Sequence, residues 1–223
     1  MRISVDIVLF GYRKSLQILL IRRKFEPFKG EWALPGGFVL EDESLEQAVL
    51  RELKEETGVE MALSRLEQIY TFGAVDRDPR ERVISVAYIG LVNPDKFQLL
   101  ADTDAADAQW FELVESPQLA FDHQEILDLA QKRLQGRLVY SPIGFDLLPE
   151  KFLFSEVEDL YQSILNIELD RRNFRKKFLG LGLLEETGER VSEGKGRPAM
   201  LYRFNKKVYE QLEKEKINLQ LLG

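Results

Sequence analysis

The sequence predicts an α/β protein in which a mixed sheet domain is followed by a smaller domain of helices and a β-hairpin. In the first part, five apolar segments rich in Val, Ile and Phe alternate with turn signals. Only two helical patterns interrupt them, which favours a mixed sheet over a regular β-α-β wind. After "LVYSPIGFDLLPEKF" the pattern becomes mainly helical. We therefore expect two domains, at residues 1–148 and 149–223.

The first domain is expected to contain short apolar strands and two amphipathic helices. The strands should cover residues 3–12, 16–23, 69–75, 83–92 and 108–113, and the helices residues 44–57 and about 122–134.

The second domain is expected to begin with two helices. Ser155 and Glu158 have the spacing of a capping box, so one helix should start there and run to about residue 165. The next should begin near Asp170 and end at Gly180 and Gly182. Two strands around a glycine-rich tip and a charged helix from about residue 206 complete the expected order.

Composition limits the chemistry that the chain can perform. It has no cysteine and one histidine, His123, so disulfides, thiolate metal sites and cysteine catalysis are excluded. Catalysis must then depend on carboxylates, arginine, lysine, hydroxyls or a metal held by oxygen. No run approaches the roughly 18 apolar residues of a membrane span, and the first residues lack the apolar core of a signal peptide. We expect a cytoplasmic protein with no membrane partner.

The net charge of −7 is unevenly distributed along the chain. Residues 1–149 hold 17 Lys and Arg against 25 Asp and Glu, whereas residues 150–223 hold 14 against 13. An acidic first part and a nearly neutral second part suggest two different roles.

The segment "GGFVLEDESLEQAVLRELKEETGVE" places three glutamates on the buried side of a predicted helix. At about 100° per residue, Glu52, Glu55 and Glu56 overlap the face that carries the apolar side chains, whereas Arg51 falls on the solvated face. Carboxylates at this spacing repel one another and lose hydration unless a cation lies among them. Mg²⁺ or Mn²⁺ suits a chain with no cysteine, because both prefer oxygen ligands.

The same segment resembles a complete Nudix box. The matching positions are Gly37, Glu43, Arg51-Glu52-Leu53, Glu55-Glu56 and Gly58-Val59. The resemblance implies an α/β/α sandwich that holds divalent metals against the diphosphate of a nucleoside diphosphate derivative. It also implies that Glu52, Glu55, Glu56 and the Gly37 carbonyl bind metal, and that Arg51 and Glu43 orient them. The three glutamates and Arg51 are thus the expected catalytic residues.

Hydrolysis of a diphosphate also needs a general base. Bound metals would neutralise the phosphate oxygens and lower the pKa of water. Nudix proteins often take the base from a loop carboxylate outside the box, and the candidates here are Asp102, Asp104 and Asp107. Glu52 or Glu55 could serve instead, and the sequence does not choose among them.

Two basic segments near the box suggest contacts with a substrate. Arg22 and Arg23 come at the end of a strand and suit phosphate oxygens. The loop "GAVDRDPRERV", which contains Arg77 and Arg80, together with "LAFDHQEIL" resembles a Nudix subgroup associated with ADP-ribose. These four arginines are candidate substrate-binding residues. His123 is expected to be a structural residue at a helix start.

The predicted helix from Asp170 has an apolar face and a basic face. Phe174 and Phe178 lie one helical turn apart on the apolar side. The candidate DNA contacts on the basic side are Arg171, Arg172, Arg175 and Lys176. With the helix before it, this is the order of a helix-turn-helix, and the tip that carries Arg197 would form a wing.

The stretches "LDRRNFRKKFLGLGLLEETGE" and "GRPAMLYRF" extend the resemblance to nearly the whole chain. Together the two parts resemble the bacterial Nudix-related regulators of NAD metabolism. This resemblance implies a homodimer that binds a double-stranded DNA operator and responds to ADP-ribose. The intact box favours a Mg²⁺-dependent pyrophosphohydrolase that cleaves ADP-ribose, or a similar nucleotide, to AMP and a sugar phosphate. An ADP-ribose-responsive repressor is the alternative or a second role, and a hydrolase for FAD or NADH is a third reading.

Overall fold

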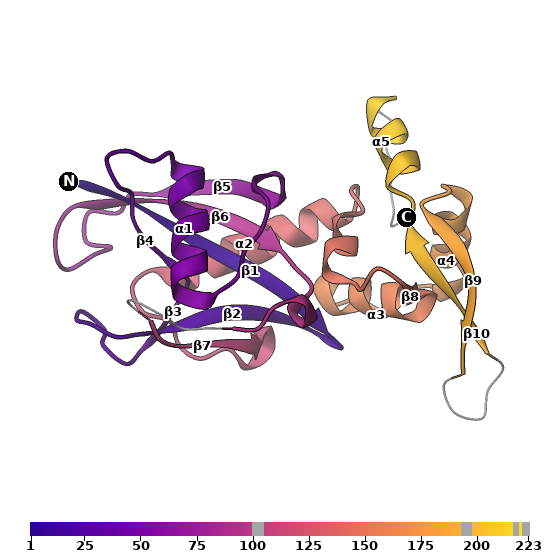
Figure 1. The fold of residues 1–223 in the computed structure, drawn as a ribbon, viewed down its shortest axis with the longest axis horizontal. Helices are drawn as coiled ribbons and strands as arrows, with labels where there is room; N and C mark the ends of the chain where they lie inside the picture. Colours follow the sequence, from indigo (N-terminus) through magenta and orange to yellow (C-terminus); the bar gives the residue numbers. More distant parts are fainter. Residues whose placement is uncertain (100–104, 193–197, 216–218, 220–223) are drawn as a thin grey trace. The chain divides into compact units, whose positions relative to one another are not determined.

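The computed structural model describes residues 1–99, 105–192, 198–215 and 219, and it confirms the predicted α/β class (Figure 1). The chain divides into two compact units, Met1–Arg133 and Leu134–Gly223. This division falls inside a helix, whereas the sequence suggested a boundary between residues 148 and 149, which stays a prediction.

The first unit is built on a seven-stranded mixed sheet. Its strands are β1 (Arg2–Arg13), β2 (Ser15–Arg23), β3 (Trp32–Ala33), β4 (Gly36–Phe38), β5 (Leu66–Phe72), β6 (Val83–Leu91) and β7 (Ala105–Glu112). The main order is β3-β2-β1-β6-β5, while β4 pairs with β1 and β7 with β2. Only the pairing of β1 with β6 is parallel among the described strands. The near-continuous apolar sequence of β1 follows from its central position, where both faces are buried.

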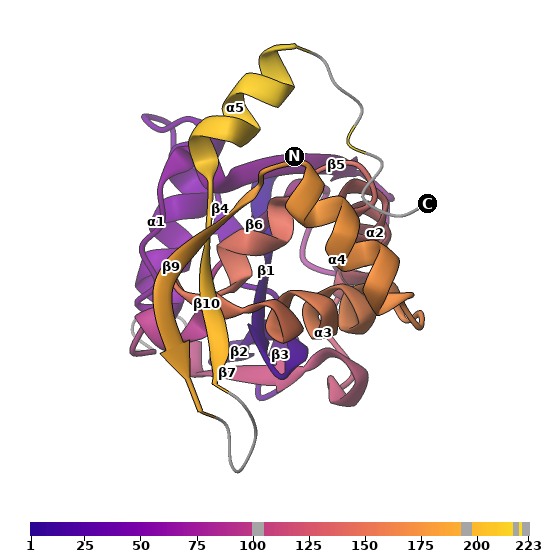
Figure 2. The same ribbon diagram turned by 90° about the vertical axis from the view of Figure 1, so that its right-hand side faces the viewer.

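Helices cover both faces of this sheet. Figure 2 shows β1 and β6 between α1 (Leu45–Thr57) and the beginning of α2 (His123–Leu138). Val5, Ile7 and Leu9 alternate along β1 toward α1, where they join Val49 and Leu53 in a fully buried cluster. The sandwich therefore holds α1 rigidly against the sheet.

The ends of α1 follow from local sequence. The Ser44 hydroxyl accepts a hydrogen bond from the Gln47 backbone N–H, and the Gln47 side chain accepts one from the Ser44 N–H. This reciprocal capping box satisfies two N–H groups that the helix itself cannot bond. The helix ends at Thr57, the predicted residue, and Gly58 follows with a left-handed φ of 73°.

The second unit contains a three-stranded sheet and three helices after α2. These elements are β8 (Phe152–Leu153), α3 (Phe154–Leu165), α4 (Arg171–Gly180), β9 (Leu184–Val191), β10 (Ala199–Phe204) and α5 (Lys206–Lys214). The strand order is β8-β10-β9, with antiparallel pairs. The core is rich in aromatic rings, which include Phe145, Phe152, Phe154, Tyr161, Phe174, Phe178 and Phe204.

Two sequence-based expectations for helices need correction. The expected capping box at Ser155 and Glu158 is wrong, because α3 starts at Phe154 and Glu156 accepts the hydrogen bond from the Leu153 N–H. Glu158 is instead buried against α4. The helix expected to stop near residue 134 continues to Leu138. In the part of the chain that the structure describes, no helix is long and apolar enough to cross a bilayer.

Candidate functional site

A cavity of about 390 Å³ lies in the first unit, lined by α1 residues Arg51, Glu52 and Glu56 and by the residues of β4. It has the size expected of a small-molecule pocket. Its acidic lining residues are Asp6, Glu26, Glu52, Glu56 and Asp78. Its cationic and aromatic lining residues are Arg23, Lys24, Arg51, Arg77, Arg80, Phe25, Phe38 and Phe121. Both signs of charge and several aromatic rings are thus available to one ligand.

Two glycines allow the backbone of β4 to approach the carboxylates of the pocket. A Cβ at Gly37 would lie 2.2 Å from Glu52 Oε1, and a Cβ at Gly36 would lie 2.2 Å from the Val5 carbonyl oxygen. Gly36 also has φ of 157°, which a residue with a side chain rarely adopts. Its N–H donates a 2.9 Å hydrogen bond to Glu56 Oε2. The backbone N–H of Gly36 therefore holds Glu56 in place, and the backbone of β4 at Gly37 lies directly against the Glu52 carboxylate.

Arg51 is the cation that compensates the acidic face of α1. Its Nε and Nη2 donate hydrogen bonds to the two oxygens of Glu43 at 3.0 and 2.7 Å. Its Nη1 donates to Glu52 at 2.9 Å and Glu55 at 3.0 Å, and Nη2 also reaches the Phe38 carbonyl. These bonds use the five guanidinium donors. They raise the pKa of Arg51, and the bond from Arg51 lowers the pKa of Glu43.

The expected position of Arg51 on the solvated face is therefore wrong. Helical side chains lean toward the N-terminus of the helix, so the long arginine chain can turn back to Glu43 and Phe38. Its role as an orienting residue, which the Nudix box implied, fits the five hydrogen bonds that it makes.

The three box glutamates do not converge as the helix phase suggested. Glu52 and Glu56 line the cavity, whereas Glu55 is 42% exposed, bonds to Arg51 and is not among the lining residues. No three acidic or histidine side chains among the described residues are grouped closely enough to hold an ion together. Even so, Glu52, Glu56 and the carbonyl of Gly37 offer oxygen ligands at one end of the pocket, which is the donor chemistry that Mg²⁺ or Mn²⁺ prefers.

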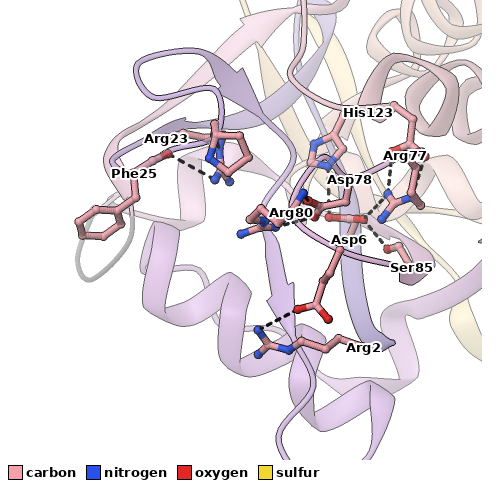
Figure 3. Close-up of polar contacts among 12 residues, drawn as sticks. Arg2, Asp6, Arg23, Phe25, Arg77, Asp78, Arg80, Ser85 and His123 are labelled. Atoms are coloured by element: carbon pink, nitrogen blue, oxygen red, sulfur yellow. Dashed lines mark hydrogen bonds and ion pairs between the residues drawn. The ribbon is translucent and has the colours of Figure 1, made fainter. Parts of the chain in front are cut away.

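A buried charged network forms the inner wall of the pocket (Figure 3). Arg77 donates two hydrogen bonds to Asp122, at 2.8 and 2.6 Å, and its Nη2 lies 3.6 Å from Asp6. Ser85 donates a hydrogen bond to Asp6. Since the side chain of Arg77 is 4% exposed, this candidate substrate-binding residue is largely engaged within the protein.

His123 belongs to the same network. Its Nδ1 accepts a 2.9 Å hydrogen bond from the Leu34 N–H, so that nitrogen carries no proton. Its Nε2 lies 3.5 Å from Asp6 Oδ1. Burial lowers the pKa of His123, despite the nearby carboxylates. The ring is therefore held neutral at the start of α2, the structural position that the sequence suggested.

Arginine and phenylalanine alternate along another wall of the pocket. The guanidinium of Arg80 lies 5.1 Å from the centre of the Phe38 ring and 5.6 Å from that of Phe121. The guanidinium of Arg23 lies 4.8 Å from the centre of the same Phe121 ring. Asp78 accepts hydrogen bonds from Arg80 Nε and Nη2, which fixes the plane of the guanidinium. Stacking and ion pairing together pre-orient this cationic wall toward an anion.

The remaining predicted residues of the first unit lie outside the pocket or outside the described residues. Arg22 and Arg23 point to opposite faces of β2, so only Arg23 lines the cavity, while Arg22 bonds to the Gly30 carbonyl. Asp107 lies on β7 opposite Arg22 of β2 and accepts a hydrogen bond from the Ala108 backbone N–H, and it does not line the cavity. Asp102 and Asp104 are not among the described residues.

Sequence reasoning missed several residues of the pocket, including Asp6, Asp78 and Phe121. Asp6 carried a usable signal, because an aspartate within "ISVDIVLF" is a polar residue in an otherwise apolar buried strand. Phe121 carried only the resemblance of "LAFDHQEIL" to an ADP-ribose subgroup, because its place in the pocket depends on tertiary contacts that periodicity does not reveal.

In the second unit, α4 carries the predicted basic face. Arg172 and Lys176 are exposed, and no hydrogen bond or ion pair joins either to another described residue. Arg171 lies 3.8 Å from Glu158 and 3.5 Å from Asp159. Arg175 stacks on Phe154 and donates to the Tyr202 hydroxyl. Arg197, the candidate contact in the wing, lies outside the described residues.

The α/β/α sandwich with its glutamate-lined pocket defines a Nudix domain, and α3, α4 and the β9-β10 hairpin define a winged helix. The NUDIX domain family matches residues 1–130, and the NrtR DNA-binding winged helix domain family matches residues 144–204. The chain belongs to the NrtR family of proteins, which combine these two domains.

Similar proteins support this assignment. An ADPR responsive transcriptional repressor from Acinetobacter baylyi is 36% identical over 93% of this chain and 83% of its own length. An ADP-ribose pyrophosphatase from Methanocaldococcus jannaschii is 47% identical, over 51% of this chain and 65% of its own length. The crystal structure of Shewanella oneidensis NrtR complexed with a 27mer DNA has a TM-score of 0.77 and 34% identity, covering 93% of this chain and 95% of that one.

Proposed function

We propose that this chain is an ADP-ribose-responsive DNA-binding repressor of NAD metabolism, acting as a homodimer in the cytoplasm. The observation that carries the proposal is the presence, in one chain, of a nucleotide-sized pocket and an exposed basic helix in a winged helix. The similarity to an ADPR responsive repressor over 93% of the chain supports it. So does the Nudix domain of Shewanella oneidensis NrtR complexed with ADP ribose, which is 39% identical over 60% of this chain, with a TM-score of 0.55.

Within the pocket, the cationic wall is suited to a diphosphate. Asp78 holds the Arg80 guanidinium in one plane, so less side-chain entropy is lost when a phosphate binds. Arg23 lies across the same Phe121 ring and would supply a second charge. Arg77 would position the wall rather than touch the ligand, because Asp122 already takes two of its donors.

On the winged helix, Arg172 and Lys176 are best placed for DNA. Both are exposed on α4 and lie one turn apart, so they can approach neighbouring phosphates. Arg175 would mainly support the helix, since its guanidinium is held between Phe154 and Tyr202.

A gel-shift titration with the DNA upstream of the chain's own gene tests this function. We expect Arg172→Ala with Lys176→Ala to weaken binding about ten-fold or more and to lower the salt slope by roughly two phosphate contacts. The matched control is Lys96→Ala with Lys132→Ala, which removes the same charge from exposed positions in the first unit. ADP-ribose should release the wild-type complex. Equal binding by both double variants would contradict the proposal.

Hydrolysis of ADP-ribose is the second candidate function, favoured by the Glu52, Glu56 and Gly37 oxygens that share the pocket. We propose that these residues and Glu55 would hold Mg²⁺ or Mn²⁺, which would neutralise diphosphate oxygens and lower the pKa of a bound water. Arg51 would orient Glu52 and Glu55, while Arg23 and Arg80 would bind the diphosphate. The general base stays open among Asp102, Asp104, Asp107 and a box glutamate.

A metal-dependent panel of ADP-ribose, FAD, NADH and sugar nucleotides tests this second function. Release of AMP from ADP-ribose should require Mg²⁺ and disappear in Glu56→Gln, because a neutral amide oxygen attracts a divalent cation far more weakly than a carboxylate does. Chelation should have the same effect. Undiminished turnover in that variant would exclude hydrolysis at this site. Near-zero wild-type rates with tight ADP-ribose binding would leave the repressor as the only one of the two proposed functions.

A further inference from the structure

Phe25 is an aromatic side chain that the fold does not bury. It is 57% exposed and lines the cavity of the first unit. No ring contact joins it to another aromatic side chain of the described chain. Figure 3 shows it at the outer end of the labelled residues, beyond Arg23 and away from His123.

Phe28, three residues later in the same loop, shows what a structural phenylalanine does here. Its ring packs edge to face on Phe121 with a centroid distance of 4.7 Å, and it borders the cluster of Ile21, Ala33 and Ala120. Phe28 thus anchors the loop, whereas Phe25 lines the outer part of the pocket with its ring largely exposed.

The loop that carries Phe25 is tied down. Arg23 Nε donates to the Pro27 carbonyl at 2.9 Å and Nη2 reaches the Phe25 carbonyl at 3.4 Å. Backbone bonds from Arg23 to the Glu31 carbonyl and from Gly30 to the Arg23 carbonyl close its base, both at 2.9 Å. The backbone that carries Phe25 is therefore held in place before a ligand arrives, which lowers the loop entropy that binding would lose.

The charges of the pocket indicate which part of a ligand would meet this ring. A bound diphosphate would be attracted to Arg23 and Arg80, which share the Phe121 ring, and a metal would be attracted to Glu52 and Glu56. Beyond Arg23, Phe25 offers an aromatic face, which suits a planar base and gives little to a phosphate or a sugar alone.

We propose that Phe25 is a specificity-determining residue whose ring stacks on the base of a nucleoside diphosphate derivative. The inference rests on the proposed nucleotide pocket, and it adds that the protein recognises the base of the ligand. Phe25 would make the pocket prefer ligands with a base over ribose phosphates and pyrophosphate, which the arginines alone would also attract.

Binding of three probes by the full-length chain tests the inference by calorimetry: ADP-ribose, ribose 5-phosphate and pyrophosphate. Phe25→Ala should weaken ADP-ribose binding about five-fold or more, as loss of a base stack does, and change binding of the other two less than about two-fold. Phe25→Trp should restore ADP-ribose binding, and its indole fluorescence should be quenched by the base.

Two further variants serve as controls. Tyr70→Ala removes an equally exposed aromatic, at 59%, from β5 outside the pocket and should leave all three affinities unchanged. Phe28→Ala should lower the melting temperature, whereas Phe25→Ala should not.

The outcomes separate this inference from the function on which it rests. If Phe25→Ala binds ADP-ribose as tightly as wild type, or weakens all three probes equally, the stacking role is wrong while the pocket stands. A change of oligomeric state in Phe25→Ala would also overturn it, because the ring would then serve a subunit contact. Absence of ADP-ribose binding by the wild type would overturn the proposed function itself.

Discussion

The two units of this chain bury different kinds of side chain. In the first, charged groups lie inside the fold, with Asp6, Arg77 and Asp122 in contact beneath a pocket. In the second, the interior is rich in aromatic rings, and Arg172 and Lys176 lie on the outside of a helix.

This difference follows from what each unit is proposed to bind. A small anionic ligand in a pocket needs cations that are already oriented, and orientation inside a protein requires charged partners. A DNA backbone is a large surface, which needs exposed and mobile cations over a stable platform. In the first unit, buried ion pairs orient the cations of the pocket. In the second, a core of aromatic rings stabilises the helix that presents exposed cations.

The largest expected effect is on the stability of the second unit, where a buried core residue is compared with an exposed neighbour. Phe178→Ala should destabilise the second unit by about 3–5 kcal/mol, because a fully buried ring in contact with Tyr161 and Phe174 would leave a cavity. Urea unfolding followed by tyrosine and near-ultraviolet signals would measure it. The neighbouring Leu179→Ala, at 40% exposure, should cost far less, and a similar loss in both would mean that the core is not organised around these rings.

The next prediction removes the cation from the buried network of the first unit. Arg77→Met should lower the unfolding free energy by about 3–5 kcal/mol, because Asp6 and Asp122 would be left buried without their partner. The double variant Arg77→Met with Asp122→Asn should lose less than the sum of the two single variants. Additive losses in a denaturant cycle would show that the pair does not act as a unit.

The smallest expected effect uses the one histidine of the chain. Because burial lowers the pKa of His123 in the folded state, the unfolded chain takes up a proton first as the pH falls below about 6.5. The stability from the neutral ring is complete above that value. It is lost on acidification toward the lower pKa of the folded state, by at most about 1.4 kcal/mol per pH unit.

The variant His123→Asn tests this sign. Its side-chain oxygen can accept the hydrogen bond from the Leu34 N–H in place of Nδ1, but it does not titrate. Denaturant unfolding at pH 7 and pH 5.5 should show a smaller loss of stability for the variant than for wild type. Equal losses would mean that other groups account for the pH dependence.

The sequence by itself determined the α/β class, the order of the longer elements and the identity of the box, whereas the short strands β3, β4 and β8 were not predicted. Apolar periodicity revealed β1 and β2, and the spacing from Gly37 to Val59 identified the acidic helix, because local rules of helix phase and strand alternation suffice there. The basic face of α4 was equally visible, since helical periodicity separates Phe174 and Phe178 from the cations.

Only the tertiary structure decided how the charges are partnered. Arg51 was expected at the surface, but it lies among the glutamates of α1. Its position depends on hydrogen bonds to Phe38 of β4 and to Glu43, and helix phase alone does not reveal them. The alternation of β2 set Arg23 in the pocket and left Arg22 outside. Phe25 is exposed while Phe28 is packed, although both belong to one short loop. Pairings of this kind join residues far apart in the chain, so helix and strand periodicity could not predict them.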